Sequence, residues 1–272
     1  MIIAGASVGA AQAALPLEPL ENRILLCHAL GLTRVGLITQ SERVLTDAEA
    51  LALNALVARR QGGEPIAYIV GKREFFGLDF HVNPAVLIPR PDTELLVELA
   101  LERLPPHGCA LDMGTGSGAI AVAIAHSFPG ARVSALDVSE AALEVARANA
   151  AANGATVRFL HSDWFAALGG EKFDLIASNP PYIADADPHL SQGDLRFEPA
   201  GALTDRADGL SALRIIGAGA RAHLVANGWL LMEHGYDQAA QVRQLLSDLG
   251  YGDVQSWRDL AGIERVTGAR AA

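Results

Sequence analysis

The sequence predicts an α/β fold in which a doubly wound, mainly parallel, seven-stranded sheet follows a small N-terminal helical domain. Three observations predict it. Apolar residues at helical spacing occupy the first 62 positions, short β-rich segments follow at 66–82, and apolar strands alternate with helices from Cys109 onward. Such alternation is typical of a parallel sheet with helices on both faces.

The N-terminal domain is predicted over residues 1–65. Apolar residues repeat at helical spacing over 20–30, and Gly31 follows as a stop signal. The residues Thr-Asp-Ala-Glu at 46–49 form a capping-box pattern that opens a further helix, which Gln-Gly-Gly at 61–63 ends. The pattern therefore predicts a small domain of packed helices.

A β-hairpin is predicted over residues 66–84, as the link between this domain and the next. Its β-rich segments are 67–70 and 78–82, which contain β-branched and aromatic residues. Gly71 and Gly77 bracket the segment between them, so we expect the chain to turn there.

The second domain is predicted over residues 85–272. A helix follows the segment 88–94, and two prolines at 105–106 close it. Beyond it, the expected strands are Ala110–Met113, Arg132–Leu136, Thr156–Leu160, Phe173–Ala177 and Trp229–Glu233. The expected helices are 118–127, 140–152, 208–225 and 237–249. Short strands near 254–257 and 264–266 would form an antiparallel edge pair and complete the sheet.

The composition limits the classes of function. Half of the 272 residues are hydrophobic and 19% are charged, so the chain can bury a sizeable core. The formal net charge of -10 argues against a protein that binds mainly by neutralising phosphates, although it is compatible with a local basic patch. Neither the pair Cys27 and Cys109 nor the scattered histidines have metal-ligand spacing, so we expect no metal.

No targeting or membrane segment is expected. Lys and Arg are absent before Arg23, whereas a secretory signal begins with a basic segment. The sequence contains no uninterrupted apolar run of about 18 residues, so no membrane span is predicted. We therefore expect a soluble, cytoplasmic monomer that binds neither a membrane nor, stably, a nucleic acid.

A glycine-rich loop lies between the first expected strand of the sheet and the helix that follows it. Its residues are the first expected cofactor contacts: Gly114, Thr115, Gly116, Ser117 and Gly118. Glycines let the backbone turn tightly and approach a ligand, and the helix N-terminus offers free N–H groups. The spacing fits both the dinucleotide form G-x-G-x-x-G/A, which ends at Ala119, and the G-x-G-x-G form of S-adenosylmethionine enzymes. A purely structural turn is a third interpretation.

Polar residues at two later strand ends support nucleotide binding. Asp137 lies 19 positions after Gly118, where a carboxylate accepts hydrogen bonds from ribose hydroxyls, although it could instead cap the helix after Ser139. Asp163 and Trp164 favour a single adenosine ligand, because the carboxylate can accept from the adenine amino group and the ring can pack on the base. Core packing is the alternative role for Trp164.

The tetrapeptide of Asn179, Pro180, Pro181 and Tyr182 follows the buried strand at 173–178. We predict that these four residues are catalytic and bind the substrate, and that Asn179 also contacts the cofactor. Consecutive prolines stiffen the turn and leave carbonyl acceptors beside the Asn179 side-chain oxygen. Such acceptors suit a planar NH2 group, whose delocalised lone pair is a poor nucleophile. Tyr182 is expected to place its ring against that group.

These residues predict an S-adenosylmethionine-dependent methyltransferase that acts on an amide or exocyclic amino nitrogen. A nucleic-acid methyltransferase for adenine N6 or guanine N2 is the main alternative, because the same acceptors suit any planar NH2 group. A nicotinamide-dependent oxidoreductase would use the glycine loop but leave residues 179–182 unexplained. A non-catalytic adaptor would use only the helical N-terminal domain.

The sequence resembles the bacterial release factor glutamine methyltransferases over about residues 20–267. The matching motifs are Gly71–Gly77, Pro89–Glu94, Asp112–Gly118, Asn179–Tyr182, Arg196–Pro199 and Ala202–Leu203. The resemblance implies a Rossmann-like methyltransferase fold, S-adenosyl-L-methionine as cofactor and S-adenosyl-L-homocysteine as product. It also implies a protein substrate, the glutamine of the Gly-Gly-Gln motif in class 1 peptide chain release factors, and hence a link to translation termination.

Roles for the domains and residues follow from the same resemblance. The N-terminal domain would help to dock the release factor, and the hairpin would connect it to the catalytic domain. The implied cofactor contacts are Gly114–Gly118, Asp137, Trp164 and Asn179, and the implied glutamine site is Asn179–Tyr182. Further matching positions, for which we expect a supporting arginine–carboxylate network, are Arg90, Asp92, Glu94 and Glu198.

Overall fold

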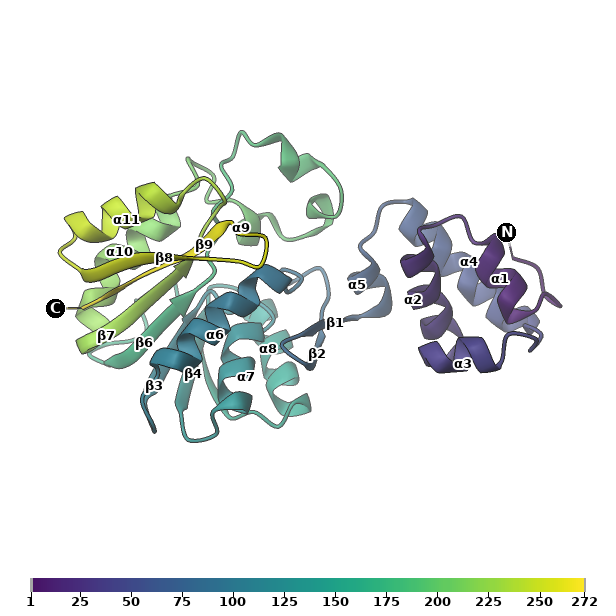
Figure 1. The fold of residues 1–272 in the computed structure, drawn as a ribbon, viewed down its shortest axis with the longest axis horizontal. Helices are drawn as coiled ribbons and strands as arrows, with labels where there is room; N and C mark the ends of the chain where they lie inside the picture. The colour runs from purple at the N-terminus through teal and green to yellow at the C-terminus, as the bar shows by residue number, and fades with distance from the viewer. Residues whose placement is uncertain (1, 272) are drawn as a thin grey trace. The chain divides into compact units, whose positions relative to one another are not determined.

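The computed structural model describes residues 2–271, so positions 1 and 272 of the predicted domains lie outside the described residues. The chain forms two compact units, one up to Gly71 and one from Lys72 onward (Figure 1). The boundary falls inside the predicted hairpin segment 66–84, because the first residues of that segment pack on the core of the N-terminal helices.

The first unit is built from short helices. They are α1 (Val8–Ala14), α2 (Pro19–Leu30), α3 (Arg34–Thr39), α4 (Asp47–Gln61) and α5 (Ile66–Val70). Both predicted helix signals are confirmed: Gly31 ends α2, and Thr46 and Glu49 form a reciprocal capping box at the start of α4. Buried leucines, including Leu25 of α2 and Leu53 of α4, form the core of this unit.

The strand predicted at 67–70 is wrong, because this segment is helical and forms most of α5. Pro65 precedes the helix, and Gly71 ends it with a left-handed backbone at φ 75°. From this helical turn, Ile69 packs into the core of the first unit. A short apolar run has no periodicity that distinguishes a buried strand from a buried helical turn, which explains the error.

The second unit begins with the hairpin, in which β1 (Lys72–Phe75) pairs antiparallel with β2 (Leu78–His81). Phe76 and Gly77 connect the strands, and both have positive φ angles, 53° and 75°, as the favoured two-residue hairpin turn requires. The hairpin is therefore shorter than predicted and starts only after Gly71.

Among the described residues, the main element of the second unit is a seven-stranded sheet. In spatial order its strands are β5 (Val157–His161), β4 (Arg132–Asp137), β3 (Cys109–Met113), β6 (Phe173–Ser178), β7 (Leu224–Glu233), β9 (Glu264–Arg270) and β8 (Gly252–Arg258). The strands β5, β4, β3, β6 and β7 are parallel to one another. Strand β9 is antiparallel to both β7 and β8. The predicted fold class and its antiparallel edge pair are confirmed. The strand order reverses between β3 and β6, the place where such sheets bind ligands.

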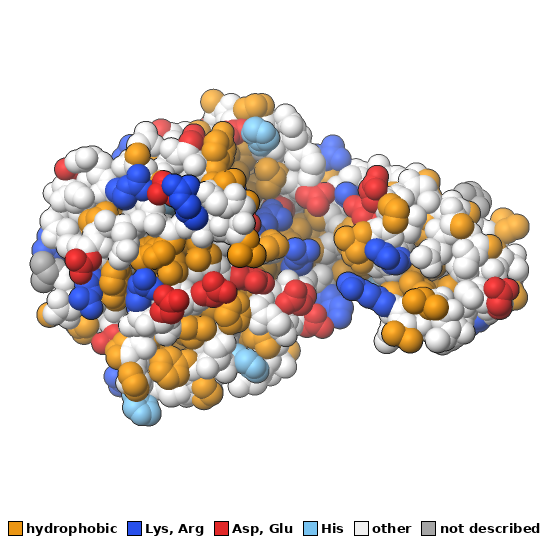
Figure 2. All heavy atoms as spheres, in the orientation of Figure 1, with side chains coloured by type: hydrophobic (Ala, Val, Ile, Leu, Met, Phe, Trp, Pro, Cys, Tyr) orange, Lys and Arg blue, Asp and Glu red, His pale blue; other side chains and the backbone are white. Residues whose placement is uncertain are grey.

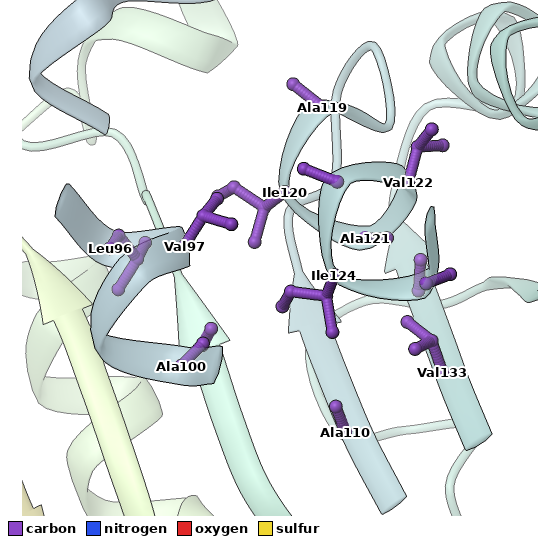
Figure 3. Close-up of a cluster of buried hydrophobic side chains, with 14 of the residues drawn as sticks. Leu96, Val97, Ala100, Ala110, Ala119, Ile120, Ala121, Val122, Ile124 and Val133 are labelled. Atoms are coloured by element: carbon purple, nitrogen blue, oxygen red, sulfur yellow. The ribbon is translucent and has the colours of Figure 1, made fainter. Parts of the chain in front are cut away.

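Helices cover both faces of the sheet (Figure 1). They are α6 (Glu94–Arg103), α7 (Ala119–Ser127), α8 (Glu140–Ala152), α10 (Ser211–His223) and α11 (Ala239–Asp248). The unit also contains the short helix α9 (Ala200–Leu203) and 3-10 turns at Pro91–Thr93, Pro188–Ser191 and Leu195–Phe197. One core layer lies under α6 and α7 and the other under α10 and α11, so neighbouring strand residues such as Leu175 and Ile176 belong to opposite layers. Figure 3 shows the first layer, in which Val97 of α6 points toward Ile120 of α7.

Within residues 2–271, no helix is long and apolar enough to cross a membrane. The same residues contain no group of His, Cys, Asp and Glu side chains arranged to hold a metal ion.

Candidate active site

A pocket of about 280 Å3 lies at the carboxyl ends of the parallel strands, where the strand order reverses. The predicted site residues that line it are Gly114, Thr115, Gly116, Ser117, Asp137, Asp163, Trp164, Asn179 and Pro181. Gly118, Pro180 and Tyr182 are not among its lining residues. Lining residues that sequence reasoning missed include Phe75, Ala85, Val86, Leu87, Thr93, Gly201 and Ala202. The hairpin residue Phe75 therefore forms part of the pocket wall.

The glycine loop is held by left-handed backbone positions and by a bond to β4. Gly114, Gly116 and Gly118 have φ angles of 72°, 52° and 83°. The amide of Gly114 donates to the carbonyl oxygen of Leu136 at 2.9 Å. A Cβ atom at Gly118 would lie only 3.1 Å from the Cβ of Ala146 in α8, so this glycine permits close packing of the loop on a helix.

Asp112, the last but one residue of β3, anchors the loop to α7. Its side chain is almost fully buried, and Oδ2 accepts hydrogen bonds from Thr115 Oγ1 at 2.6 Å and from the amide of Ala121 at 3.2 Å. Burial raises the pKa of Asp112 to about 7, although both hydrogen bonds lower it. Sequence reasoning treated Asp112 only as part of a motif; the structure gives it a specific contact on each side of the loop.

Asp137 presents a fixed carboxylate at the end of β4. Oδ2 accepts from the amide of Gly116 and Oδ1 from the amide of Ser139, both at 2.9 Å. Each oxygen of an ionised carboxylate has two acceptor positions, so one on each oxygen stays available for a pair of neighbouring hydroxyls. The cap of α8 is the side chain of Ser139, which accepts from the amide of Ala142 at 3.2 Å. The residue that caps α8 is therefore Ser139 and not Asp137.

The turn after β5 places Asp163 and Trp164 beside Asp137. The amide of Ser162 donates to the carbonyl oxygen of Asp137 at 3.0 Å, and its hydroxyl donates to the carbonyl oxygen of Trp164 at 2.7 Å. These bonds hold Trp164 at φ 45°, a conformation that few non-glycine residues adopt. Trp164 lines the pocket and also packs on the core under α10, so both of its predicted roles are compatible with its position.

Asn179 lies directly after β6, on the opposite side of β3 from Asp137. The hydroxyl of Ser178 donates to the carbonyl oxygen of Met113 at 2.7 Å and so ties the two strands together at the pocket. Asn179 Nδ2 donates to Thr93 Oγ1 at 3.1 Å. Because the amide nitrogen is held in this way, Oδ1 is the atom of the side chain left to accept a hydrogen bond.

Tyr182 is directed away from the pocket wall, toward β7. Its hydroxyl lies 3.4 Å from Glu233 Oε1, and its carbonyl oxygen accepts from Gln238 Nε2 at 3.0 Å. Burial, the largest cause, raises the pKa of Tyr182, and the charge of Glu233 raises it further. Sequence reasoning missed Glu233, although a carboxylate at the carboxyl end of an apolar strand is the same signal that pointed to Asp137.

The four positions without assigned roles each have a partner. Arg90 forms an ion pair with the buried Glu198, whose Oε2 also accepts from the amide of Ile88 at 2.9 Å. Asp92 lies 3.4 Å from Arg265, and Glu94 Oε1 accepts from the amide of Phe76 at 2.9 Å. The Arg90–Glu198 pair joins two segments that both line the pocket, so it supports the wall facing the glycine loop.

Comparisons with known proteins identify the family. Residues 91–200 match the family model of the methyltransferase small domain, and residues 8–71 match that of the PrmC N-terminal domain. A release factor glutamine methyltransferase of Burkholderia pseudomallei is 57% identical, covering 94% of this chain and 93% of that protein. One of Bordetella pertussis is 53% identical, covering 93% of this chain and 94% of its own length. The chain belongs to the release factor glutamine methyltransferase family.

A solved structure supports the fold as well. A methyltransferase from Pyrococcus furiosus aligns with a TM-score of 0.56 and 22% identity, covering 79% of this chain and 97% of that one. Membership of the release factor glutamine methyltransferases confirms the predicted enzyme class, an S-adenosylmethionine-dependent methyltransferase, and its cofactor. The oxidoreductase and adaptor alternatives are thereby excluded. The pocket fits this cofactor, since Asp137 offers acceptors for two ribose hydroxyls and Asp163 and Trp164 line the adjoining wall.

Proposed function

We propose that this enzyme methylates the side-chain amide nitrogen of the glutamine in the Gly-Gly-Gln motif of class 1 peptide chain release factors. S-adenosyl-L-homocysteine would be the second product. The observation that carries the proposal is the fixed side-chain amide of Asn179, which lines the same pocket as the glycine loop and Asp137 and whose Oδ1 accepts no hydrogen bond from the described residues. This substrate would place the enzyme in the cytoplasm, where translation takes place.

We assign the cofactor to the side of the pocket formed by β3, β4 and β5. Asp137 would accept from the ribose hydroxyls, Asp163 from the adenine amino group, and Trp164 would pack on the base. The loop from Gly114 to Gly118 would shape the wall beside them. When bound, the cofactor supplies a methyl group whose carbon is the electrophile, because it is attached to a positively charged sulfur.

We assign the glutamine amide to the side of the pocket formed by the residues after β6. Its nitrogen lone pair is delocalised into the carbonyl group and is a weak nucleophile. Asn179 Oδ1 and the carbonyl oxygen of Pro180 would accept its two N–H groups and hold the nitrogen in the direction of attack. The two prolines keep these acceptors stiff. A strong base is not required before attack, because the methylated nitrogen loses its proton readily.

The Tyr182 ring, which the sequence placed against the substrate nitrogen, turns toward Glu233 instead, so we propose that Tyr182 supports the substrate site from outside the pocket wall. The hydroxyl at 3.4 Å from Glu233 Oε1 and the Gln238 bond to its carbonyl oxygen fix the end of the tetrapeptide. Tyr182 thereby limits the positions that Pro180 and Pro181 can adopt.

We propose the N-terminal unit as the docking surface for the release factor. Six large apolar side chains on this unit are exposed, and they are Ile3, Leu20, Val35, Ile38, Val44 and Leu51. Figure 2 shows hydrophobic side chains among the polar ones on the visible surface of this unit. A protein-binding surface needs exposed apolar side chains as anchors, and these residues are the candidates for that role on this unit.

Methyl transfer in vitro tests the proposal. Purified enzyme with radiolabelled S-adenosylmethionine should label a class 1 release factor, and the label should vanish when the Gly-Gly-Gln glutamine is changed to alanine. A release factor that carries a change at a glutamine outside this motif is the matched control and should be labelled normally. Labelling of DNA or RNA with no labelling of the release factor would instead support the nucleic-acid alternative.

A further inference from the structure

Arg90 is the one Lys or Arg side chain among the described residues that line the pocket. The acidic side chains in the same wall are Asp137 and Asp163. The side chain of Arg90 is 33% exposed, although it is paired with Glu198, whose side chain is fully buried. A few charged or polar groups in a largely apolar pocket fix the orientation of a ligand, so Arg90 calls for an account beyond its support of the wall.

The ion pair with Glu198 fixes Arg90 and leaves part of its guanidinium group free. Glu198 accepts from Arg90 Nη2 through Oε1, and it accepts from the amide of Ile88 through Oε2 at 2.9 Å. Within residues 2–271 the guanidinium group forms no other hydrogen bond. It has five N–H donors in one plane, so the donors on Nε and Nη1 stay available for a second acceptor. An arginine held in this way is suited to bind a carboxylate of a ligand.

The segment that carries Arg90 lies on the β6 side of the pocket. Three residues after Arg90, Thr93 Oγ1 accepts from Asn179 Nδ2 at 3.1 Å, which ties the segment to the residues after β6. Asp137 ends β4 and Asp163 follows β5, and both of these strands lie on the other side of β3. The pocket therefore has its positive charge toward β6 and its negative charges toward β4 and β5.

We propose that Arg90 binds the α-carboxylate of S-adenosylmethionine and that Glu198 holds its guanidinium group in place. The inference rests on the cofactor position given under the proposed function. S-adenosylmethionine has its adenosine at one end, its amino-acid part at the other and the sulfur between them, and the α-carboxylate is its one anionic group. With the adenosine against Asp137 and Asp163 and the methyl group directed at Asn179, the amino-acid part lies on the β6 side, where the pocket has its cation.

This contact makes the pocket selective for ligands that have the carboxylate. Decarboxylated S-adenosylmethionine is the sharpest probe, because it keeps the adenosine, the sulfonium and the amino group. Isothermal titration of the unmodified enzyme should give a Kd for this probe about 10- to 100-fold higher than the Kd for S-adenosylmethionine, as the loss of a charge-assisted hydrogen bond predicts.

Two matched variants assign the selectivity to Arg90. A change of Arg90 alone would leave Glu198 buried without a partner and destabilise the fold. The comparison is therefore between Glu198→Gln and the double variant with Arg90→Met and Glu198→Gln, since both lack the buried charge and both keep an acceptor for the Ile88 amide. Glu198→Gln should retain the preference for S-adenosylmethionine. The double variant should lose it, with the same Kd for the decarboxylated probe and the same Tm as Glu198→Gln.

Asp137→Asn is the control on the other side of the pocket and should weaken the binding of both ligands to the same degree. An equal Kd of the unmodified enzyme for the two ligands would overturn the proposal without the use of any variant. Equal losses for both ligands in the double variant would also overturn it, because Arg90 would then only support the wall. Absence of methyl transfer to a release factor would instead refute the proposed function, and the titrations, which need no release factor, would still decide the role of Arg90.

Discussion

At the scale of single residues, Asn179 joins the two halves of the proposed site. Its nitrogen is fixed by Thr93, and within residues 2–271 its side-chain oxygen, on a residue that lines the pocket, accepts no hydrogen bond. Asn179→Ala removes the acceptor and leaves the glycine loop and Asp137 intact. We expect kcat to fall about 100- to 1,000-fold, as it does when one preorganised hydrogen-bonding group is lost from an active site. Isothermal titration should show a smaller loss in the affinity for S-adenosylmethionine, and near-normal turnover would refute the acceptor role.

Asp112 makes the stability of the folded chain depend on pH. Its pKa is about 7 in the folded protein, against an ordinary value of 3.8. Between these values the folded state binds more protons than the unfolded state, so this group contributes stability below pH 4 that is lost as the pH rises through 7. Asp112→Asn removes the titration. The free energy of unfolding of this variant minus that of the unmodified protein should therefore be larger at pH 8 than at pH 5, by on the order of 1–3 kcal/mol. Urea unfolding at both pH values measures it, and an equal difference at both would contradict it.

Sequence reasoning found the residues that directly follow apolar strands, because strand ends meet at one edge of a parallel sheet. Asp137 and Asn179 were predicted in this way, and the structure brings both to one pocket. Thr93 could not be found in this way, since it meets Asn179 across 86 positions of sequence. Its hydroxyl has no pattern that distinguishes a supporting residue from an ordinary one in a 3-10 turn.

At the scale of elements, the hairpin and the glycine loop share one clamp, Asn149 of α8. This buried side chain donates to the carbonyl oxygens of Ser117 at 2.8 Å and His81 at 3.0 Å, and it accepts from the amide of His81 at 2.7 Å. It therefore holds the edge of β2 and the cofactor loop at the same time.

Asn149→Ala should lower the free energy of unfolding by about 3 kcal/mol, because buried backbone groups lose their partners. It should also weaken S-adenosylmethionine binding through the loop at Ser117. Asn153→Ala is the control, since Asn153 donates to the carbonyl oxygen of Asp79 in a more exposed place and should lose less stability and no cofactor affinity. Equal effects of both variants in urea unfolding and titration would contradict the clamp.

Elements with a clear period were predicted well, and elements without one were not. The α8 prediction agrees with the structure over 140–152, and its polar and apolar positions follow the helical repeat. Strand β7 begins at Leu224, five positions before the predicted start, because Asn227 and Gly228 look like a turn in sequence while the sheet accommodates them as an irregularity. Tertiary packing determines where β7 begins, and it also determines that α5 is helical.

At the scale of the whole molecule, the proposed docking surface on the first unit predicts a difference between large and small substrates. Val35 and Ile38 are 67% and 77% exposed on α3. Val35→Ser with Ile38→Ser should raise the KM for an intact release factor about tenfold, since exposed apolar anchors contribute roughly 1 kcal/mol or more each. A short peptide with the Gly-Gly-Gln motif should be methylated at the same rate by this double variant and by the unmodified enzyme. Equal KM values for the intact release factor would contradict a docking role of α3.

The ion pair between Arg90 and Glu198 also has a consequence for biosynthesis. It joins residues 108 positions apart, and the pocket is lined by residues from Phe75 to Ala202. A ribosome makes the chain from its N-terminus, so the first unit and the glycine loop emerge well before the pocket wall is complete. The nascent chain therefore completes this pocket only after about three-quarters of the sequence has left the ribosome.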